Sequence, residues 1–203
     1  MNTELFTAFV LITIVLIVTP GPIVTFLIAT GAAHGVRAGM TAVAGATIGN
    51  AILIAAIAAG LSWVLKNAIG LFEILRWAGV AYLVWLGIQA WRHAGTETET
   101  PPLRRVHFWR GIFVALTNPK TIAFFTAFLP QFVDPALPAD RQLFVMCLTS
   151  IAIAFVFDSA WATAAGMGRA WFVKPARAKL LGRVSGAVLI GGGIWLSLAR
   201  RPA

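Results

Sequence analysis

Residues 5–33 of the chain read LFTAFVLITIVLIVTPGPIVTFLIATGAA and contain no Asp, Glu, Lys or Arg. A helix needs about 20 predominantly apolar residues to cross the hydrocarbon core of a bilayer. The stretch exceeds that length. It is also too long for the core of a cleavable signal peptide, which would follow a basic segment and not Glu4. The stretch therefore predicts a first transmembrane helix.

The middle of this stretch is Thr19-Pro20-Gly21-Pro22. Each proline removes a backbone donor and clashes with the preceding turn, so the helix must kink or unwind here. Backbone groups freed in this way are tolerated in lipid only where they face protein or a water-filled cavity. We therefore predict a discontinuous helix whose second half points its amide end at an anionic ligand group. The alternative is a packing kink without a ligand.

The composition of the whole chain agrees with a membrane location. Hydrophobic residues make up 59% and charged residues 11% of the 203 residues, whereas a soluble domain carries about 25% charged residues. The net charge of +9 does not indicate nucleic-acid binding. The Lys and Arg residues separate the apolar runs and do not gather on one exposed face that could contact phosphates.

Further apolar runs follow the first, at Ala38–Leu65, Trp77–Trp91, Gly111–Val133, Gln142–Gly168 and Val184–Ala199. The third run is expected to extend backwards over Glu73 and Arg76. The sequence thus predicts an all-α integral membrane protein with six transmembrane helices, forming a single membrane domain over residues 1–203. A polar, proline-containing segment at about 93–107 predicts a cytoplasmic linker between the third and fourth helices.

The basic residues also predict an orientation in the membrane. The first, third and fifth loops hold ten of the sixteen Lys and Arg residues, and the opposite side holds five. Cytoplasmic loops carry an excess of Lys and Arg. Both termini are therefore expected outside the cytoplasm.

The two halves of the chain show a weak internal repeat. Matching features occur in the same order: a proline break (Pro20 and Pro119), a polar residue deep in a helix (Asn50 and Asp158) and an Arg that opens a short run (Arg76 and Arg183). Because three helices reverse the direction of the chain, we predict two inverted three-helix repeats, at about 4–92 and about 108–201. Inverted repeats whose first helices are broken are typical of secondary transporters, with the substrate site at the repeat interface.

Two charged residues, Lys120 and Asp158, fall inside predicted membrane helices. Each costs about 2.5–3.5 kcal/mol at the centre of a bilayer unless it is paired or hydrated. The two are therefore expected to lie near each other or to share one wet cavity. They could form a structural ion pair. Alternatively, Asp158 takes up and releases a coupling proton, while Lys120 attracts a substrate carboxylate or compensates Asp158.

Predicted site residues follow from these features. The predicted substrate-binding residues are Thr19, Pro20, Gly21, Pro22, Asn50, Asn118, Pro119 and Lys120. Asp158 is the predicted proton-coupling residue. Gly45 and Gly49 have the spacing that allows helices to approach closely, and Gly191-Gly192-Gly193 is assigned the same packing role.

No metal site or cofactor is expected. The three histidines, His34, His93 and His107, fall in predicted loops without metal-ligand spacing, and the single cysteine, Cys147, is isolated. An intramembrane enzyme, one alternative function, would need a nucleophile and a base at one depth, and the sequence shows no such arrangement. Efflux of a metal or another small ion is a second alternative, which the lack of a buried Cys, His or carboxylate cluster disfavours.

Three stretches carry a family resemblance: Thr19-Pro20-Gly21-Pro22, Ile48-Gly49-Asn50, and the segment from Asn118-Pro119-Lys120-Thr121 to Phe128-Leu129-Pro130-Gln131-Phe132. They closely resemble the lysine exporter family, in its homoserine/threonine-efflux branch, and Asp158 followed by Trp161 is similar to the fifth helix of that branch. The resemblance covers nearly the whole chain.

The resemblance implies a six-helix, multi-pass exporter in the bacterial inner membrane, without catalytic residues. The implied substrates are amino acids of the homoserine, threonine, leucine or lysine kind, and the implied driving force is a proton gradient or the membrane potential. The expected partners are an amino-acid substrate and membrane lipid, with no nucleic acid, and a homodimer is left open.

Overall fold

The computed structural model describes residues 2–67, 69–94, 107–172 and 174–198, and every regular element in these ranges is a helix. The elements are α1 (Thr3–Val18), α2 (Pro22–His34), α3 (Val36–Asn67), α4 (Ile69–Arg92), α5 (His107–Leu116), α6 (Pro119–Phe128), the 3-10 helix η1 (Leu129–Phe132), α7 (Ala139–Met167), α8 (Arg169–Phe172) and α9 (Pro175–Leu198). The predicted linker at about 93–107 falls mainly on residues 95–106, which lie outside the described residues.

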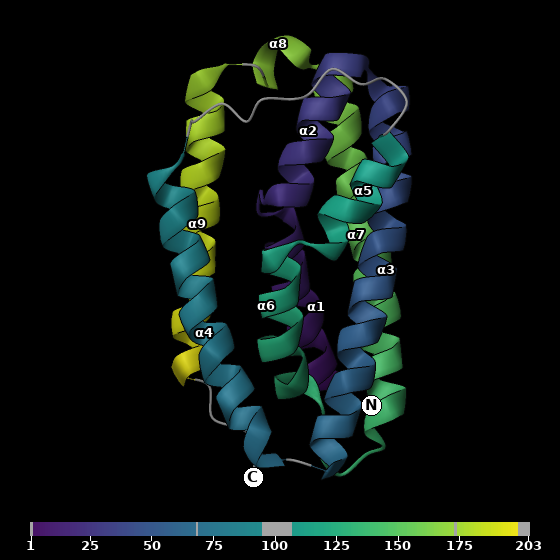
Figure 1. The fold of residues 1–203 in the computed structure, drawn as a ribbon, viewed down its shortest axis with the longest axis vertical. Coiled ribbons are helices and arrows are strands. Elements are labelled where there is room, and N and C mark those ends of the chain that lie inside the picture. The colour runs from purple at the N-terminus through teal and green to yellow at the C-terminus, as the bar shows by residue number, and fades with distance from the viewer. Residues whose placement is uncertain (1, 68, 95–106, 173, 199–203) are drawn as a thin grey trace.

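The helices run along the long axis of the molecule and alternate in direction (Figure 1). The start of α1, the end of α9 and the starts of α4 and α7 lie at the lower end of the view. The ends of α2, α4 and α7, the start of α9 and the short helix α8 lie at the upper end. The described chain therefore begins and ends at the same end of the bundle, as the predicted topology requires. Which end faces the cytoplasm stays a prediction from the basic residues.

Both predicted proline breaks are confirmed. Helices α1 and α2 form one apolar unit bent by 47°, and α5 forms another with α6 and η1, bent by 41°. Three single helices, within α3, α7 and α9, are long and apolar enough to cross a membrane, so the described residues hold up to five spans if each bent pair counts as one. The remaining predicted span, the third along the chain, corresponds to α4, which has 24 residues but is not among these five. The count of six stays a prediction.

Helices α4 and α9 are longer than the short apolar runs in the sequence. Each has 24 residues, because charged residues in its first turns continue the helix instead of ending it. Arg76 shows how one such charge is accommodated. Its side chain is buried, donates to the carbonyls of Leu196 and Ser197 at 3.3 and 3.4 Å, and forms an ion pair with Glu73. It thus stabilises the carboxyl end of α9, where a cation interacts favourably with the helix dipole.

Glycines set the closest helix contacts. A Cβ added at Gly45 of α3 would overlap the Phe108 carbonyl of α5, and one at Gly49 would lie 2.6 Å from the Ile112 carbonyl oxygen. The predicted packing role of this pair is confirmed. The prediction is wrong for two glycines of α9, since an added Cβ would meet nothing within 4 Å at Gly191 and only Phe128, at 3.7 Å, at Gly192.

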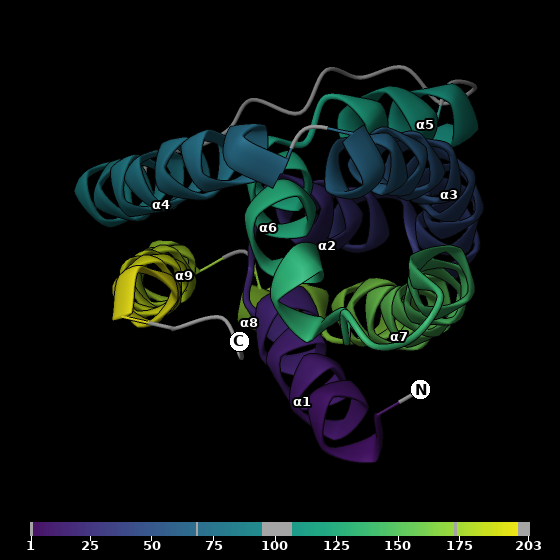
Figure 2. The ribbon, with the colours of Figure 1, turned by 90° about the horizontal axis from the view of Figure 1, so that it is seen from below.

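The buried apolar side chains form two clusters. One joins α1, α3, α4, α6, η1, α7 and α9 and includes Phe9 and Leu143. The other joins α2, α3, α5 and α7 and includes Leu27, Ala46 and Ala162. Seen along the bundle, α1, α2 and α6 lie between the α3–α7 side and the α4–α9 pair (Figure 2). The two broken helices are therefore central, and their breaks meet inside the bundle.

Candidate functional site

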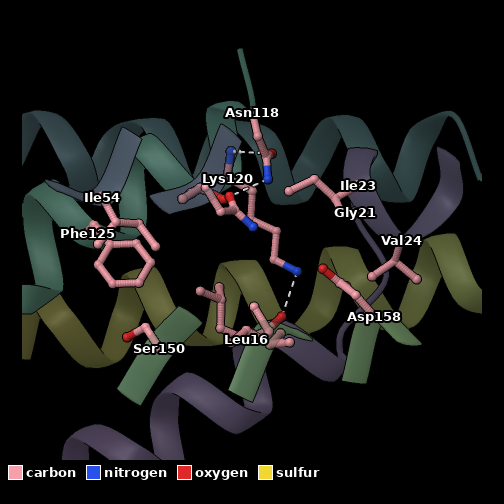
Figure 3. A pocket seen from close by; sticks show the side chains of 14 residues that line it. Leu16, Gly21, Ile23, Val24, Ile54, Asn118, Lys120, Phe125, Ser150 and Asp158 are labelled. Atoms are coloured by element: carbon pink, nitrogen blue, oxygen red, sulfur yellow. Dashed lines mark hydrogen bonds between the residues drawn. The ribbon is translucent and has the colours of Figure 1, made fainter. Parts of the chain in front are cut away.

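A cavity of about 40 Å³ lies where the two helix breaks meet (Figure 3). Its walls include Leu16 and Ile54 from the first apolar cluster and Ile23 from the second. Packed apolar side chains of both clusters therefore border the cavity. Its polar side chains are Asn50, Asn118, Lys120, Thr121, Ser150 and Asp158.

The first break leaves backbone groups without helical partners. Thr19 N–H still donates to the Val15 carbonyl at 3.2 Å, so the helical pattern of α1 continues to Thr19. The next acceptor, the Leu16 carbonyl, would bond to residue 20, but Pro20 has no N–H. Gly21 is extended, and α2 begins at Pro22 without a side-chain cap. The carbonyl end of α1 and the amide end of α2 thus both lie at the cavity.

Lys120 supplies the donor that Pro20 lacks. Its Nζ donates to the carbonyls of Leu16 at 2.6 Å and Thr19 at 2.5 Å, and the side chain is 6% exposed. An ammonium group at the carboxyl end of a helix is also favoured by the helix dipole. A Cβ added at Gly21 would lie 2.9 Å from Cδ and 3.4 Å from Nζ of Lys120. The glycine between the two prolines therefore leaves room for the lysine.

The second break orients this lysine. Asn118 is the N-cap of α6: its Oδ1 accepts from the Lys120 N–H at 3.2 Å, and its Nδ2 donates to Thr121 Oγ1 at 2.7 Å. Pro119 occupies the first helical position, where a missing N–H does no harm. The Asn-Pro-Lys sequence thus starts a helix and places Lys120 in its first turn, opposite the end of α1.

Two acceptors in the cavity have no hydrogen bond to the described residues. Asn50 of α3 is 5% exposed and its Oδ1 lacks a partner. Asp158 of α7 is 3% exposed. Its carboxylate points into the cavity near the Lys120 ammonium (Figure 3), but within the described ranges no ion pair joins the two. Lys120 and Asp158 share one cavity, as expected, and act on each other electrostatically. Whether the two form a structural pair or take part in transport stays open.

The structure brings together most of the predicted site residues. Gly21, Asn50, Asn118, Lys120 and Asp158 line the cavity. Thr19 contributes its carbonyl oxygen, whereas the three prolines create the breaks without lining the cavity.

The sequence reasoning missed Thr121 and Ser150 as lining residues. A signal for Ser150 was available, because Ser150, Ala154 and Asp158 are four residues apart and share one face of α7. The Ser150 hydroxyl donates to the Met146 carbonyl of its own helix at 2.8 Å.

Two of the three histidines do not lie where the sequence placed them, whereas His93 lies in a turn, as predicted. His34 ends α2 and His107 begins α5, so the prediction that both fall in loops is wrong, and their ring centroids are 4.8 Å apart. Helix boundaries are weakly encoded in a chain where apolar runs end gradually. Among the residues described by the structure, no three His, Cys, Asp or Glu side chains are grouped to hold a metal ion.

A family model described as a LysE type translocator matches residues 14–200. The chain belongs to the LysE type translocator family. Family membership agrees with the resemblance found in the sequence and indicates a transporter. The long apolar helices agree with a membrane protein.

Three relatives of this LysE type translocator differ in what their names state. The homoserine/homoserine lactone efflux protein of Salmonella typhimurium is 37% identical over 98% of this chain and 99% of its own. An uncharacterized membrane protein of Vibrio cholerae is 31% identical over 98% of this chain and 100% of its own. The leucine efflux protein of Klebsiella pneumoniae is 34% identical over 71% of each chain. No solved structure matches the translocator.

Proposed function

We propose that this chain is a secondary-active exporter of amino acids in the bacterial inner membrane. The observation that carries the proposal is that Asn50 Oδ1, which has no hydrogen-bond partner, and the Asp158 carboxylate both line one cavity between two broken helices. Relatives named as homoserine and leucine efflux proteins support it. Homoserine and leucine each carry an α-ammonium and an α-carboxylate. A site for them requires a set of hydrogen-bond acceptors and a set of donors close together.

The cavity offers both sets. The α-ammonium of a substrate would donate to the Asp158 carboxylate and to Asn50 Oδ1. The α-carboxylate would accept from the free N–H groups of Ile23 and Val24, which line the cavity in the uncapped first turn of α2. Lys120 adds a positive charge on the same side. Because each of these groups recognises the backbone part of an amino acid, they do not by themselves select a side chain.

The cavity is too small for a whole substrate in the described conformation. A cavity of about 40 Å³ holds a few water molecules, whereas small-molecule pockets measure about 300–1,000 Å³. Transport therefore requires the halves of the broken helices to separate on one side and then on the other, which is the alternating access of secondary transporters.

The inverted three-helix repeats and the proton coupling are parts of the same proposal. Supporting the repeats, the two breaks bend by 47° and 41° and meet at one cavity, which Asn50 and Asp158 line from the matching helices α3 and α7. Supporting the coupling, Asp158 is a buried carboxylate beside the Lys120 ammonium, with no ion pair between the two among the described residues. It could therefore bind a proton in exchange for a substrate ammonium.

The test is export from cells. Cells making the protein are loaded with dipeptides, and the free amino acids that appear in the medium are measured. We expect faster appearance of at least one amino acid than in cells without the protein, and loss of this gain in Asn50→Leu. Thr41→Val is the matched control, because Thr41 is an exposed residue of the same helix whose hydroxyl bonds its own backbone. Equal release with and without the protein, at a confirmed membrane level, would overturn the proposal.

A further inference from the structure

A second, larger cavity lies beside the first. It measures about 290 Å³ and lies between α1, α4, α6 and α9, and its lining residues are aliphatic, aromatic or glycine. It opens to the outside of the bundle, where its lining residues Leu11, Val15 and Trp195 are exposed. Its volume is close to the lower limit of about 300 Å³ for small-molecule pockets. The central cavity, at about 40 Å³, is too small for an amino acid, so a bound substrate must extend into additional space.

Leu16 is the boundary between the two cavities, because it lines both. Its carbonyl holds the Lys120 ammonium. Helix α6 follows the same boundary: Phe125 lines the central cavity and Phe124 the apolar one. A molecule bound at Asn50 and Asp158 could therefore reach the apolar cavity past a single residue, if the Leu16 side chain turns aside.

The apolar cavity owes its depth to two glycines. Gly191 and Gly192 line it, and Cβ atoms added there would make no close contact. Glycine in a helix is about 1 kcal/mol less favourable than alanine, and here no neighbouring helix needs the space. The opposite wall is aromatic: Phe128 stacks on Phe124 with centroids 4.7 Å apart and on Trp195 with centroids 5.6 Å apart. The apolar cavity is thus bordered by two glycines on one side and by stacked aromatic rings on the other.

We propose that this apolar cavity receives the aliphatic side chain of the exported amino acid, while its ammonium and carboxylate stay in the central cavity. The inference rests on the proposed function and adds the substrate class. Aliphatic side chains are accepted because they bury apolar surface against Phe124, Phe128 and Trp195. Charged side chains are excluded because the cavity offers them no polar partner. A lipid acyl chain is the other molecule that an apolar hollow in a membrane would take.

Transport by purified protein in liposomes distinguishes a substrate side chain from a lipid acyl chain as the occupant of the apolar cavity. Liposomes preloaded with unlabelled amino acid are given labelled alanine or leucine, and the counterflow of each is measured. We expect Gly192→Leu to lower the ratio of leucine to alanine transport by about tenfold or more, since one methylene in an apolar pocket already changes selectivity by about 10–200-fold. The matched control is Gly60→Leu, because Gly60 of α3 also has open space around it but lines neither cavity.

Two further variants guard against a folding defect in Gly192→Leu. Gly192→Ala adds one carbon at an ordinary contact distance and should lower the same ratio by a smaller factor. Leu16→Ala widens the boundary between the two cavities and should raise the ratio of leucine to alanine transport. An unchanged ratio in all three variants would overturn the inference and is the result expected if a lipid chain fills the cavity. A wild type that transports other amino acids but not leucine would overturn it while leaving the proposed function intact. A wild type that transports no amino acid would refute both.

Discussion

Replacing Lys120 with methionine removes the ammonium that bonds the carbonyls of Leu16 and Thr19 but keeps most of the side-chain volume. Each buried carbonyl left without a donor costs about 1–3 kcal/mol. The free energy of unfolding is therefore expected to fall by about 2–6 kcal/mol. Equilibrium unfolding of the purified protein in mixed detergent micelles, followed by tryptophan fluorescence, measures this loss.

The structure also predicts which second change compensates. Pro20→Ala restores an N–H and removes the restriction that keeps Thr19 extended, so the helix is expected to continue and the new N–H to bond the Leu16 carbonyl. In the Lys120→Met background, Pro20→Ala should recover about 1–3 kcal/mol. In the wild type it should recover little, since Lys120 already bonds that carbonyl. The double-mutant cycle should therefore show a coupling of about 1–3 kcal/mol.

Pro22→Ala is the matched control for this cycle. It restores a donor for the Val18 carbonyl, to which Lys120 does not bond, so Pro22→Ala and Lys120→Met should act independently. If Pro20→Ala and Lys120→Met were additive within about 0.5 kcal/mol, the assignment of Lys120 as the substitute for the missing proline donor would be refuted.

Three further predictions follow from the same structure. Asp158→Asn cannot release a proton, so counterflow exchange in liposomes should continue while net export against a gradient is lost; undiminished net export would refute coupling through Asp158. Gly45→Ala should destabilise the protein by about 1–3 kcal/mol or more, because the added carbon overlaps the Phe108 carbonyl, whereas Gly60→Ala should be neutral or stabilising; equal thermal unfolding of the two variants would show the close contact to be unimportant. A reporter fused after Arg201 should be active outside the cytoplasm and one inserted in residues 96–102 inside it, and the same compartment for both would contradict the predicted six spans.

The sequence predicts the broken helices well because their cause is local. Pro20, Pro22 and Pro119 exclude a continuous helix whatever surrounds them, and a buried charge such as Asp158 requires a polar environment. The partner of Lys120 could not be predicted. It consists of backbone carbonyls 104 and 101 residues away in the chain, and a carbonyl that lacks a donor leaves no mark in the residue type.

The glycines show the same limit. Gly45 and Gly192 are identical in sequence terms, and both lie inside apolar helices. Only the position of a neighbouring helix makes one a close contact with Phe108 and leaves the other facing a hollow. The extension of the third run over Glu73 and Arg76 was predicted and is present in α4. The contacts of Arg76 with the end of α9 could not be predicted, because they arise from tertiary packing.

Binding of an amino acid to the purified protein tests the central claim most directly, namely that the cavity between the two breaks is the substrate site. The ligand is the labelled amino acid that leaves loaded cells faster, and its binding is measured at equilibrium for the wild type, Asn50→Leu, Asp158→Ala and the control Thr41→Val. A hydrogen bond to a charged group contributes about 1.5–3 kcal/mol, so each cavity variant should weaken binding by about 10–150-fold, while Thr41→Val binds like the wild type. Wild-type affinity in both Asn50→Leu and Asp158→Ala would contradict the claim and place the substrate elsewhere.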